Sequence, residues 1–391
     1  MLLLHPTPKT IDFVRELVGF DTVSRHSNLD LIHWIRDYLA GLGVDSSLIF
    51  DETKLKANLF ATIGPNDVPG YVLSGHTDVV PVDGQDWATN PFEVVERDGR
   101  LFGRGTSDMK SFIAVVLASV PQFLRAELHA PIHLAFSYDE EVGCRGVPSL
   151  LDFIRSKQVR PQLCIVGEPT DMKVVIAHKG SKRYRCVVRG HECHSALADR
   201  GVNAIEAACE LVSRLKSIAR RKTTQGPFDC EFDPPYTTVH TGVIQGGTAL
   251  NIVPKHCSFE FEFRHIPEDD PLILLEELKS YAHATLEPEM HSVNPDTGIE
   301  FSLKSQLAGL STPDADEGVS LAKALSQSAT AGKISFGTEG GLFQAAGIPT
   351  VVCGPGSIDQ AHKPDEWITL EQIALCEGFI GRLAGHLSRH F

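Results

Sequence analysis

The fold is decided by the stretch Tyr71-Val-Leu-Ser-Gly-His-Thr-Asp-Val-Val-Pro81, in which a short apolar run ends at a histidine and an aspartate. Three similar runs, at residues 132–138, 163–167 and 350–354, are followed by a charged residue or by proline. Apolar runs of this length, bounded in this way, are typical of buried strands. We therefore expect the four runs to be core strands of one sheet.

Helical patterns alternate with these strands. Apolar residues recur at helical spacing in residues 30–42, and residues 111–124 form a strongly apolar helix. Residues 11–18 and 371–387 also have helical patterns, near the two ends of the chain. This alternation predicts the α/β class, with helices on both faces of a mixed sheet.

The middle of the chain has a different order of elements. Strands and helices alternate there as βαββαβ, the order of a ferredoxin-like unit. The expected strands are 182–189, 237–245, 256–264 and 299–305, and the expected helices are 202–219 and 271–286. The polar residues 220–235 are expected to form a loop.

This middle region interrupts the α/β pattern, so we expect it to be an inserted domain. The predicted boundaries divide the chain into a first part of the main domain at 1–180, the inserted domain at 181–306, and a second part of the main domain at 307–391. A chain of 391 residues is also longer than one core usually supports, which agrees with two domains.

Composition excludes several classes of protein. The net charge of −14 argues against a general nucleic-acid binder or a binder of anionic membranes. No run is long enough to span a bilayer, and residues 1–8 lack the basic and apolar segments of a secretory signal, so we expect a cytoplasmic protein. None of the nine cysteines forms a CxxC pair, which favours reduced thiols over a disulfide framework or a thiolate zinc site.

Candidate metal ligands follow the predicted core strands. His76 ends the first run, Glu140 and Glu141 follow the second, Glu168 follows the third, and His362 lies in the loop after the fourth. Sites form at the carboxyl ends of the strands in open α/β sheets. One such residue at a strand end is commonplace, but ligand types at the ends of several strands indicate a shared site.

Asp108, just before the helix at 111–124, completes the set. With one ligand from the pair Glu140 and Glu141, the set has two histidines and three carboxylates, which suit zinc, cobalt or manganese better than metals that prefer thiolates. A pair of divalent ions roughly 3.5–4 Å apart polarises a carbonyl and lowers the pKa of water. The sequence therefore predicts two divalent metal ions per subunit. The residue types fit zinc, cobalt or manganese, and we expect zinc or cobalt.

Each of these residues also has a simpler explanation when it is taken alone. His76 could be a buried histidine with satisfied hydrogen bonds, and Asp108 could cap the following helix, a role compatible with metal binding. Glu168 precedes a proline and could lie in a surface turn. Their joint placement favours the metal site.

Several motifs resemble those of the co-catalytic zinc peptidase and deacylase family, whose members include deacetylases, desuccinylases, aminoacylases and carboxypeptidases. The resemblance covers nearly the whole chain in the family's order. Besides the stretch quoted first, the motifs are Gly103-Arg-Gly-Thr-Ser-Asp-Met-Lys110, Asp139-Glu-Glu-Val-Gly143, Val166-Gly-Glu-Pro-Thr170 and Ala361-His362.

The resemblance implies a role for each candidate ligand. His76 and Glu168 would bind one metal ion, Glu141 and His362 would bind the other, and Asp108 would bridge the two. The resemblance also implies a zinc-peptidase-like catalytic domain with an inserted lid or dimerisation domain, and hence a homodimer.

Further roles are implied for residues that do not bind metal. The carboxylate of Asp78 would fix the imidazole of His76. Glu140 would be the general base, taking a proton from the attacking water and passing it to the departing amine. In the inserted domain His194 would stabilise the oxyanion, with His191 as the competing candidate.

Three residues are candidates for binding substrate. The resemblance assigns Asn251 and Arg264 to the substrate α-carboxylate, which a guanidinium suits. Asn251 could instead be a turn residue, and Arg264 could pair with a glutamate on its own strand. We expect Glu339 to contact the ammonium of an ornithine-like side chain.

The closing segment 354–367 is most similar to the family members that cleave N2-acetyl-L-ornithine to L-ornithine and acetate, in arginine biosynthesis. The resemblance thus implies this small-molecule reaction. Desuccinylation, aminoacylase or dipeptidase activity are alternatives within the family. A non-catalytic binding protein is the alternative outside it, but no ligand of the predicted set is missing.

Overall fold

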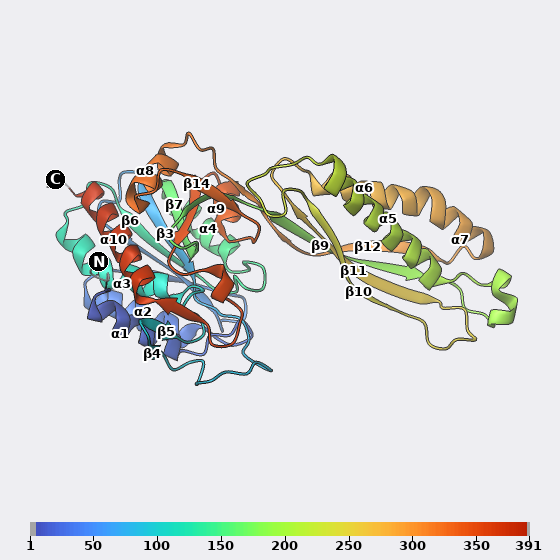
Figure 1. The fold of residues 1–391 in the computed structure, drawn as a ribbon, viewed down its shortest axis with the longest axis horizontal. Helices are drawn as coiled ribbons and strands as arrows, with labels where there is room; N and C mark the ends of the chain where they lie inside the picture. The colour runs from blue at the N-terminus through green and yellow to red at the C-terminus, as the bar shows by residue number, and fades with distance from the viewer. Residues whose placement is uncertain (1–4, 389–391) are drawn as a thin grey trace. The chain divides into compact units, whose positions relative to one another are not determined.

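A computed structural model of the chain describes residues 5–388 and divides into two compact units (Figure 1). Unit 2 consists of His178–Gly309 and Ile334–Gly337, and unit 1 contains the remaining described residues on either side of it in sequence. The expectation of no secretory signal rests partly on residues 1–4, which lie outside the described residues.

Unit 1 is built on a nine-stranded mixed sheet. In spatial order its strands are β1 (Ser46–Phe50), β2 (Ala57–Ile63), β6 (Ile132–Ser137), β3 (Gly70–His76), β7 (Pro161–Pro169), β15 (Thr350–Gly354), β8 (Val174–His178) and β13 (Leu310–Ser311), with β14 (Ala331–Ile334) paired to β8. The four predicted core strands, β6, β3, β7 and β15, lie side by side and run parallel. Their carboxyl ends therefore meet at one edge of the sheet.

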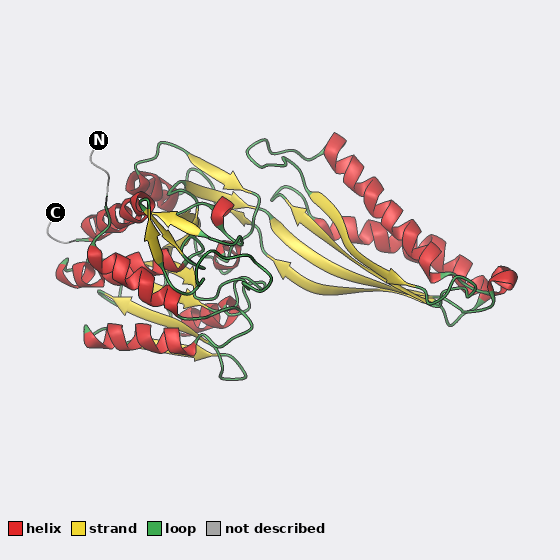
Figure 2. Ribbon diagram, turned by 60° about the horizontal axis from the view of Figure 1, so that its bottom comes forward, coloured by secondary structure: helices red, strands yellow, loops and turns green. Residues whose placement is uncertain are grey.

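Helices cover both faces of this sheet, as predicted (Figure 2). This explains why every residue of β3 and β6 is buried, whereas a half-exposed strand would alternate. The helices of unit 1 are α1 (Pro8–Gly19), α2 (Leu29–Gly41), α3 (Lys110–Arg125), α4 (Val147–Ser156), α8 (Glu317–Ser326), α9 (Gly340–Ala345) and α10 (Leu370–Leu387). A small second sheet pairs β4 (Val95–Arg97), β5 (Arg100–Phe102) and β16 (Trp367–Thr369).

The packing of α3 onto β7 depends on one glycine. A Cβ atom at Gly167 would lie 2.0 Å from Cγ of Phe112, far inside van der Waals contact. Phe112 is fully buried, so it has no room to move away. Only glycine at position 167 lets α3 lie this close to the sheet.

Unit 2 has the predicted βαββαβ order. Its antiparallel sheet has the spatial order β10-β11-β9-β12. Its elements are β9 (Gly180–Arg189), a 3-10 turn (Ser195–Arg200), α5 (Ala204–Gln225), β10 (Thr238–Gly246), β11 (His256–His265), α6 (Pro271–Tyr281), α7 (Glu287–Val293) and β12 (Gly298–Leu307). The single helix expected at 271–286 is instead α6 followed by a π-helical turn, Ala282–Leu286, that leads into α7. The unit has its own hydrophobic core, separate from that of unit 1.

The expected loop at 220–235 is wrong in its first part, because α5 continues to Gln225. Two basic residues of this segment, Arg221 and Lys222, pair with acidic partners, and Lys222 is buried. Lys222 Nζ lies 2.8 Å from Asp269 Oδ1 in a mostly buried ion pair, and Arg221 binds Glu277. These contacts hold the last turn of the helix.

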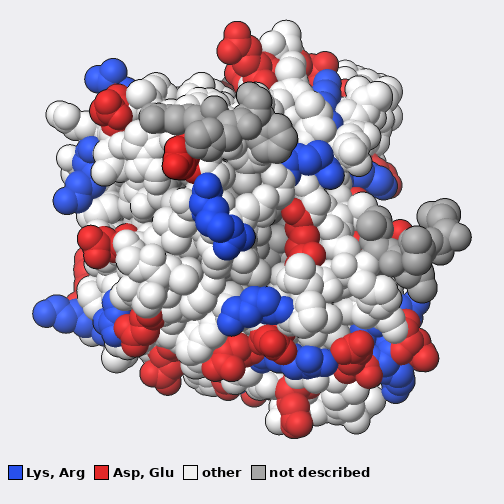
Figure 3. All heavy atoms as spheres, turned by 90° about the vertical axis from the view of Figure 1, so that its left-hand side faces the viewer, with Lys and Arg blue, Asp and Glu red and all other residues white. Residues whose placement is uncertain are grey.

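No helix within residues 5–388 is long and apolar enough to cross a membrane. Figure 3 shows one face of the molecule, on which acidic and basic side chains are interspersed and neither charge forms a continuous patch.

A buried histidine in β6 makes the stability of unit 1 depend on pH. His133 is 3% exposed, its Nδ1 lies 2.9 Å from Thr62 Oγ1, and its ring stacks on Phe60. Burial lowers the pKa of His133 to about 4. Between pH 4 and the ordinary imidazole value of about 6.5, the unfolded chain therefore binds a proton that the folded chain does not.

We expect this difference to reduce stability as the pH falls through that window, by at most about 1.4 kcal/mol per pH unit. In His133→Gln the midpoint of urea unfolding should depend less steeply on pH between 4.5 and 6.5 than in the wild type. The exposed His129 provides the matched control, His129→Gln, which should keep the wild-type slope. Equal slopes for His133→Gln and the wild type would contradict this account.

Candidate metal centre

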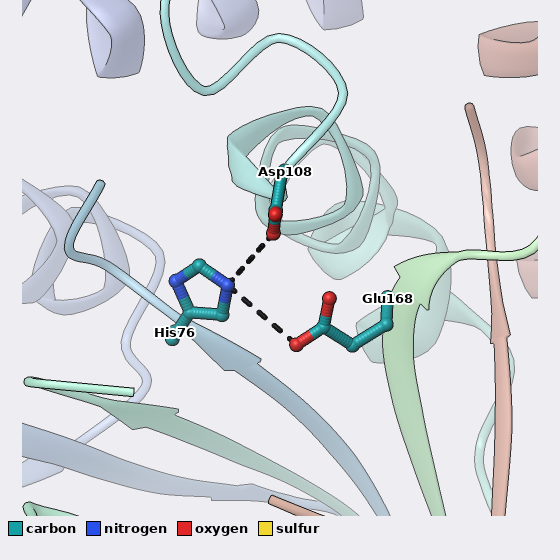
Figure 4. Close-up of side chains that lie close together, drawn as sticks. All are labelled: His76, Asp108 and Glu168. Atoms are coloured by element: carbon teal, nitrogen blue, oxygen red, sulfur yellow. Dashed lines mark hydrogen bonds and ion pairs between the residues drawn. The ribbon is translucent and has the colours of Figure 1, made fainter. Parts of the chain in front are cut away.

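The carboxyl edge of the parallel strands brings together a first group of candidate ligands. His76 is the last residue of β3, Glu168 lies near the end of β7, and Asp108 lies just before α3. His76 Nε2 lies 2.9 Å from Asp108 Oδ1 and 3.6 Å from Glu168 Oε1 (Figure 4). All three side chains are buried.

A second group shares Asp108 with the first. His362 Nε2 lies 3.0 Å from Glu141 Oε2 and 3.4 Å from Asp108 Oδ2. Within each group of three, the potential ligand atoms lie within 4.8 Å of one another. Asp108 directs one oxygen to each histidine, which is the geometry that a residue bridging two metal ions requires.

The hydrogen bonds of His76 determine which ring nitrogen faces the cluster. Nδ1 lies 2.8 Å from the backbone carbonyl of Asp78, and a carbonyl can only accept, so Nδ1 carries the proton. Nε2 of the neutral ring then presents its lone pair to the Asp108 carboxylate. Two acceptors 2.9 Å apart require a cation or an additional proton between them.

The carboxylate of Asp78 has a different role from the one the sequence predicted. It lies 3.7 Å from His76 Nδ1 and is engaged by other donors. Oδ1 accepts the backbone N–H of Glu140 at 3.0 Å, and Oδ2 accepts that of Glu141 at 3.3 Å and the hydroxyl of Ser24 at 2.6 Å. Asp78 thus orients the imidazole through its backbone and the Glu140–Glu141 turn through its side chain.

Burial and mutual repulsion shift the titration of the acidic groups. Burial raises the pKa of Glu140 to about 8 and that of Glu141 to about 7, and nearby carboxylates add to both shifts. Burial, followed by the charge of Asp108, raises the pKa of Glu168. The ionised forms of these carboxylates are therefore unfavourable at this edge of the sheet unless nearby positive charge compensates them.

The pKa values of the two histidines are raised, which is the direction that supplies this positive charge. Hydrogen bonds to Asp108 and Glu141 raise the pKa of His362 to about 10. Although burial opposes it, hydrogen bonding by both histidines holds the pKa of Asp108 below its usual range. Protons and divalent cations compete for the same lone pairs in such a cluster, and two imidazoles with three carboxylates fit zinc-like ions.

Glu140 belongs to neither ligand group, although it is adjacent to Glu141 in sequence. Its Oε1 lies 3.2 Å from Cys144 Sγ, which is a weak donor. The site thus contains one carboxylate that is in neither ligand group.

Unit 2, taken by itself, brings two of its predicted residues together. Asn251 and His194 are both exposed, and the backbone carbonyl of Asn251 accepts the N–H of Ser195 at 3.0 Å. His194 Nδ1 accepts the N–H of Ala196 at 3.1 Å, so its other ring nitrogen carries the donor proton when the ring is neutral. His191, the competing candidate, lies 2.9 Å from the side-chain amide of Asn294.

Arg264 is partly engaged within its own sheet. Its Nε lies 2.8 Å from Glu262 Oε1, and Glu262 also binds Arg183. The alternative recognised in the sequence, pairing with a glutamate of the same strand, therefore describes the contact that this structure contains.

The prediction for Glu339 does not hold. Its side chain is fully buried, and its two oxygens accept hydrogen bonds of 2.6 Å from the hydroxyls of Ser74 and Ser137. The carboxylate thus ties the N-terminus of α9 to β3 and β6. It is not accessible to a substrate ammonium.

Sequence reasoning also missed residues that hold the ligands in place. Gln85 donates to the backbone carbonyl of His362, and Glu366 accepts the backbone N–H of Asp108. Arg104 donates to both Gln85 and Glu366 and so connects them. Arg104 lies within the Gly103–Lys110 motif and Glu366 lies within the closing segment. The presence of Arg104 and Glu366 in these motifs was the feature of the sequence that could have identified them.

Comparison with known proteins decides the family. The sequence model of the peptidase family M20/M25/M40 matches residues 72–386. The chain belongs to this family. The predicted class, a metal-dependent hydrolase, is thereby confirmed.

Full-length relatives and solved structures of the M20 family agree with this assignment. Proteins named acetylornithine deacetylase from Proteus mirabilis and Myxococcus xanthus are 32% and 35% identical to this chain, over 96% and 95% of both sequences. Aminopeptidase PepT from Bacillus cereus has a TM-score of 0.75 at 19% identity, covering 98% of this chain and 99% of its own. The Bacillus subtilis YXEP protein, described as a dinuclear metal binding M20 peptidase, has a TM-score of 0.69 at 17% identity, with 98% of both chains covered. These structures show the shared fold.

Divalent ions should stabilise this M20 protein, because they neutralise the carboxylate cluster only in the folded state. We expect the melting temperature to fall after dialysis against a chelator and to rise again with free zinc or cobalt. The gain in unfolding free energy is about 2.7 kcal/mol when the free ion is at 100 times its Kd. Magnesium, which prefers oxygen ligands, should have a smaller effect. A melting temperature that is independent of zinc would contradict the metal site.

Proposed function

We propose that this chain hydrolyses the N-acetyl amide of N2-acetyl-L-ornithine, giving L-ornithine and acetate. Full-length identity of 32–35% to relatives named acetylornithine deacetylase supports this substrate. The observation that carries the chemistry is the pair of ligand groups joined by Asp108 at the carboxyl edge of the sheet. The product would serve arginine biosynthesis in the cytoplasm.

In this proposal two divalent ions, zinc or cobalt, are held by the two ligand groups. His76, Asp108 and Glu168 would hold one ion, and Asp108, Glu141 and His362 the other. Such a pair, when bound, polarises the substrate carbonyl and lowers the pKa of water.

Glu140 acts as the general base in the proposed mechanism. It takes a proton from the attacking water and delivers it to the departing amine. Its support is positional: the turn that carries it is fixed by Asp78, and its carboxylate lies in neither ligand group. The carbon–nitrogen bond breaks as the amine receives the proton.

The proposal gives three residues of unit 2 the roles that the family resemblance implies. His194 stabilises the oxyanion as a hydrogen-bond donor, and Asn251 with Arg264 binds the substrate carboxylate. Arg264 would have to share its guanidinium with Glu262. Unit 2 would serve as a lid and as the dimerisation domain of a homodimer.

Substrate selectivity distinguishes this proposal from other M20 activities. Because Glu339 is buried, the ornithine side chain no longer has its predicted partner, and the choice of ornithine rests on similarity along the full chain. We expect kcat/KM of the zinc- or cobalt-loaded protein to be highest for N2-acetyl-ornithine among three substrates, the others being N-acetyl-methionine and N-succinyl-diaminopimelate. Chelation should abolish all activity. Preference for another substrate would retain the mechanism and reject the assigned reaction.

Replacement of the proposed base should separate catalysis from metal binding. We expect Glu140→Gln to lower kcat by about 10²–10⁴-fold, because proton transfer is lost. Two metal ions per subunit should remain, measured by elemental analysis. The exposed Glu52 gives a control, Glu52→Gln, that should retain wild-type kcat and metal content. Near-normal kcat in Glu140→Gln would exclude this residue as the base.

A further inference from the structure

His362 differs from the other candidate ligands in how its position is fixed. The other four side chains are at most 8% exposed, whereas that of His362 is 53% exposed and lies in a loop. Its backbone φ is +63°, in the left-handed region that residues other than glycine rarely adopt. Such a conformation persists only where the surrounding structure holds it.

Gln85 provides one of the contacts that hold this loop. Its Nε2 donates to the backbone carbonyl of His362 at 3.0 Å. Its Oε1 accepts from Arg104 Nη2 at 2.7 Å and from Trp87 Nε1 at 3.0 Å. Three residues after His362, the Asp365 carboxylate accepts the N–H of Ala88 at 2.9 Å. The segment 85–88 therefore holds the His362 turn at both ends.

Arg104 connects Gln85 to a buried carboxylate. Arg104 and Glu366 are each 1% exposed, and their Nη1 and Oε2 atoms lie 2.7 Å apart. The guanidinium also lies over the ring of Trp87, 5.0 Å from its centroid. A removed partner would leave an uncompensated buried charge, so this pair strongly constrains the local geometry.

Glu366 in turn fixes the segment that carries Asp108. Its Oε1 accepts the backbone N–H of Ser107 at 2.8 Å and of Asp108 at 3.0 Å, and its Oε2 accepts that of Gly105 at 3.0 Å. Together with the ion pair to Arg104, these hydrogen bonds engage both carboxylate oxygens of Glu366. A chain of contacts thus runs from the Asp108 segment through Glu366, Arg104 and Gln85 to His362.

We propose that Gln85, Arg104 and Glu366 form a brace that sets the position of His362 relative to Asp108. In this proposal Gln85 is a positioning residue for the metal ion that His362 and Asp108 would share. The inference rests on the proposed metal sites. Gln85 is in neither ligand group and acts through the backbone of His362. Removing such an outer contact typically weakens metal binding by about 10–100-fold.

The amide at position 85 allows this role to be separated from general stability. Gln85 uses its oxygen toward Arg104 and its nitrogen toward His362. In Gln85→Glu the acceptor for Arg104 and Trp87 remains, but the donor to His362 is replaced by an oxygen that repels its carbonyl. The fold should therefore be retained while His362 loses its support.

The test is a zinc titration of the chelator-treated full chain in competition with a chromophoric chelator, alongside thermal unfolding of the same metal-free samples. We expect Gln85→Glu to weaken one of two zinc sites by about 10–100-fold, with an unchanged melting temperature. The control is Gln162→Glu, because Gln162 Nε2 makes a similar contact of 3.0 Å to the carbonyl of Pro69 at the opposite edge of the sheet. It should bind zinc as the wild type does.

Glu366→Gln provides a second variant, which should weaken both sites because Asp108 belongs to both ligand groups. Wild-type affinities in Gln85→Glu, or a lower melting temperature without loss of affinity in Glu366→Gln, would show that the brace is only structural and overturn this inference alone. A wild-type chain that binds fewer than two zinc ions would overturn the proposed metal sites, and this inference with them.

Discussion

Repulsion among buried carboxylates is the constraint on which unit 1 depends. Asp108, Glu141 and Glu168 converge with Glu140 on one edge of the sheet, where burial penalises their charged forms. Parallel strands make this convergence unavoidable, since their carboxyl ends coincide. The surrounding structure holds the segments that carry these groups by hydrogen bonds to their backbone: Asp78 accepts the N–H of Glu140, and Glu366 accepts that of Asp108. Packing supplies the rigidity, and the two histidines supply lone pairs that fit the cluster to hold metal ions.

Much of this arrangement could be predicted from the sequence, because the core strands are continuous apolar runs. The ligands could be predicted because each follows one of these runs or a motif. Edge strands such as β1, whose residues are only partly buried, have no such signal. The extension of α5 to Gln225 was also hidden, because the partners of its basic residues lie 47 and 56 positions further along the chain.

Individual side-chain roles were harder to predict than positions. Asp78 is two residues from His76, and the sequence alone does not tell whether its carboxylate or its backbone contacts the imidazole. Glu339 was expected to contact a substrate ammonium, yet its carboxylate accepts hydrogen bonds from two serines of different strands. Gln85 lies in none of the motifs and carries no signal for metal binding, because it acts through hydrogen bonds to other segments. Burial and partner choice depend on tertiary structure that local patterns do not encode.

The contact between Gly167 and Phe112 has a consequence for how this site can change during evolution. Gly167 immediately precedes Glu168, and Phe112 lies four residues after Asp108, so one interatomic contact links the segments of two candidate ligands. A larger residue at Gly167 is tolerated only if Phe112 changes with it, which is strong epistasis between distant parts of the sequence. Variation that alters substrate range is therefore expected to accumulate in loops away from this contact, while Gly167 remains fixed unless Phe112 changes with it.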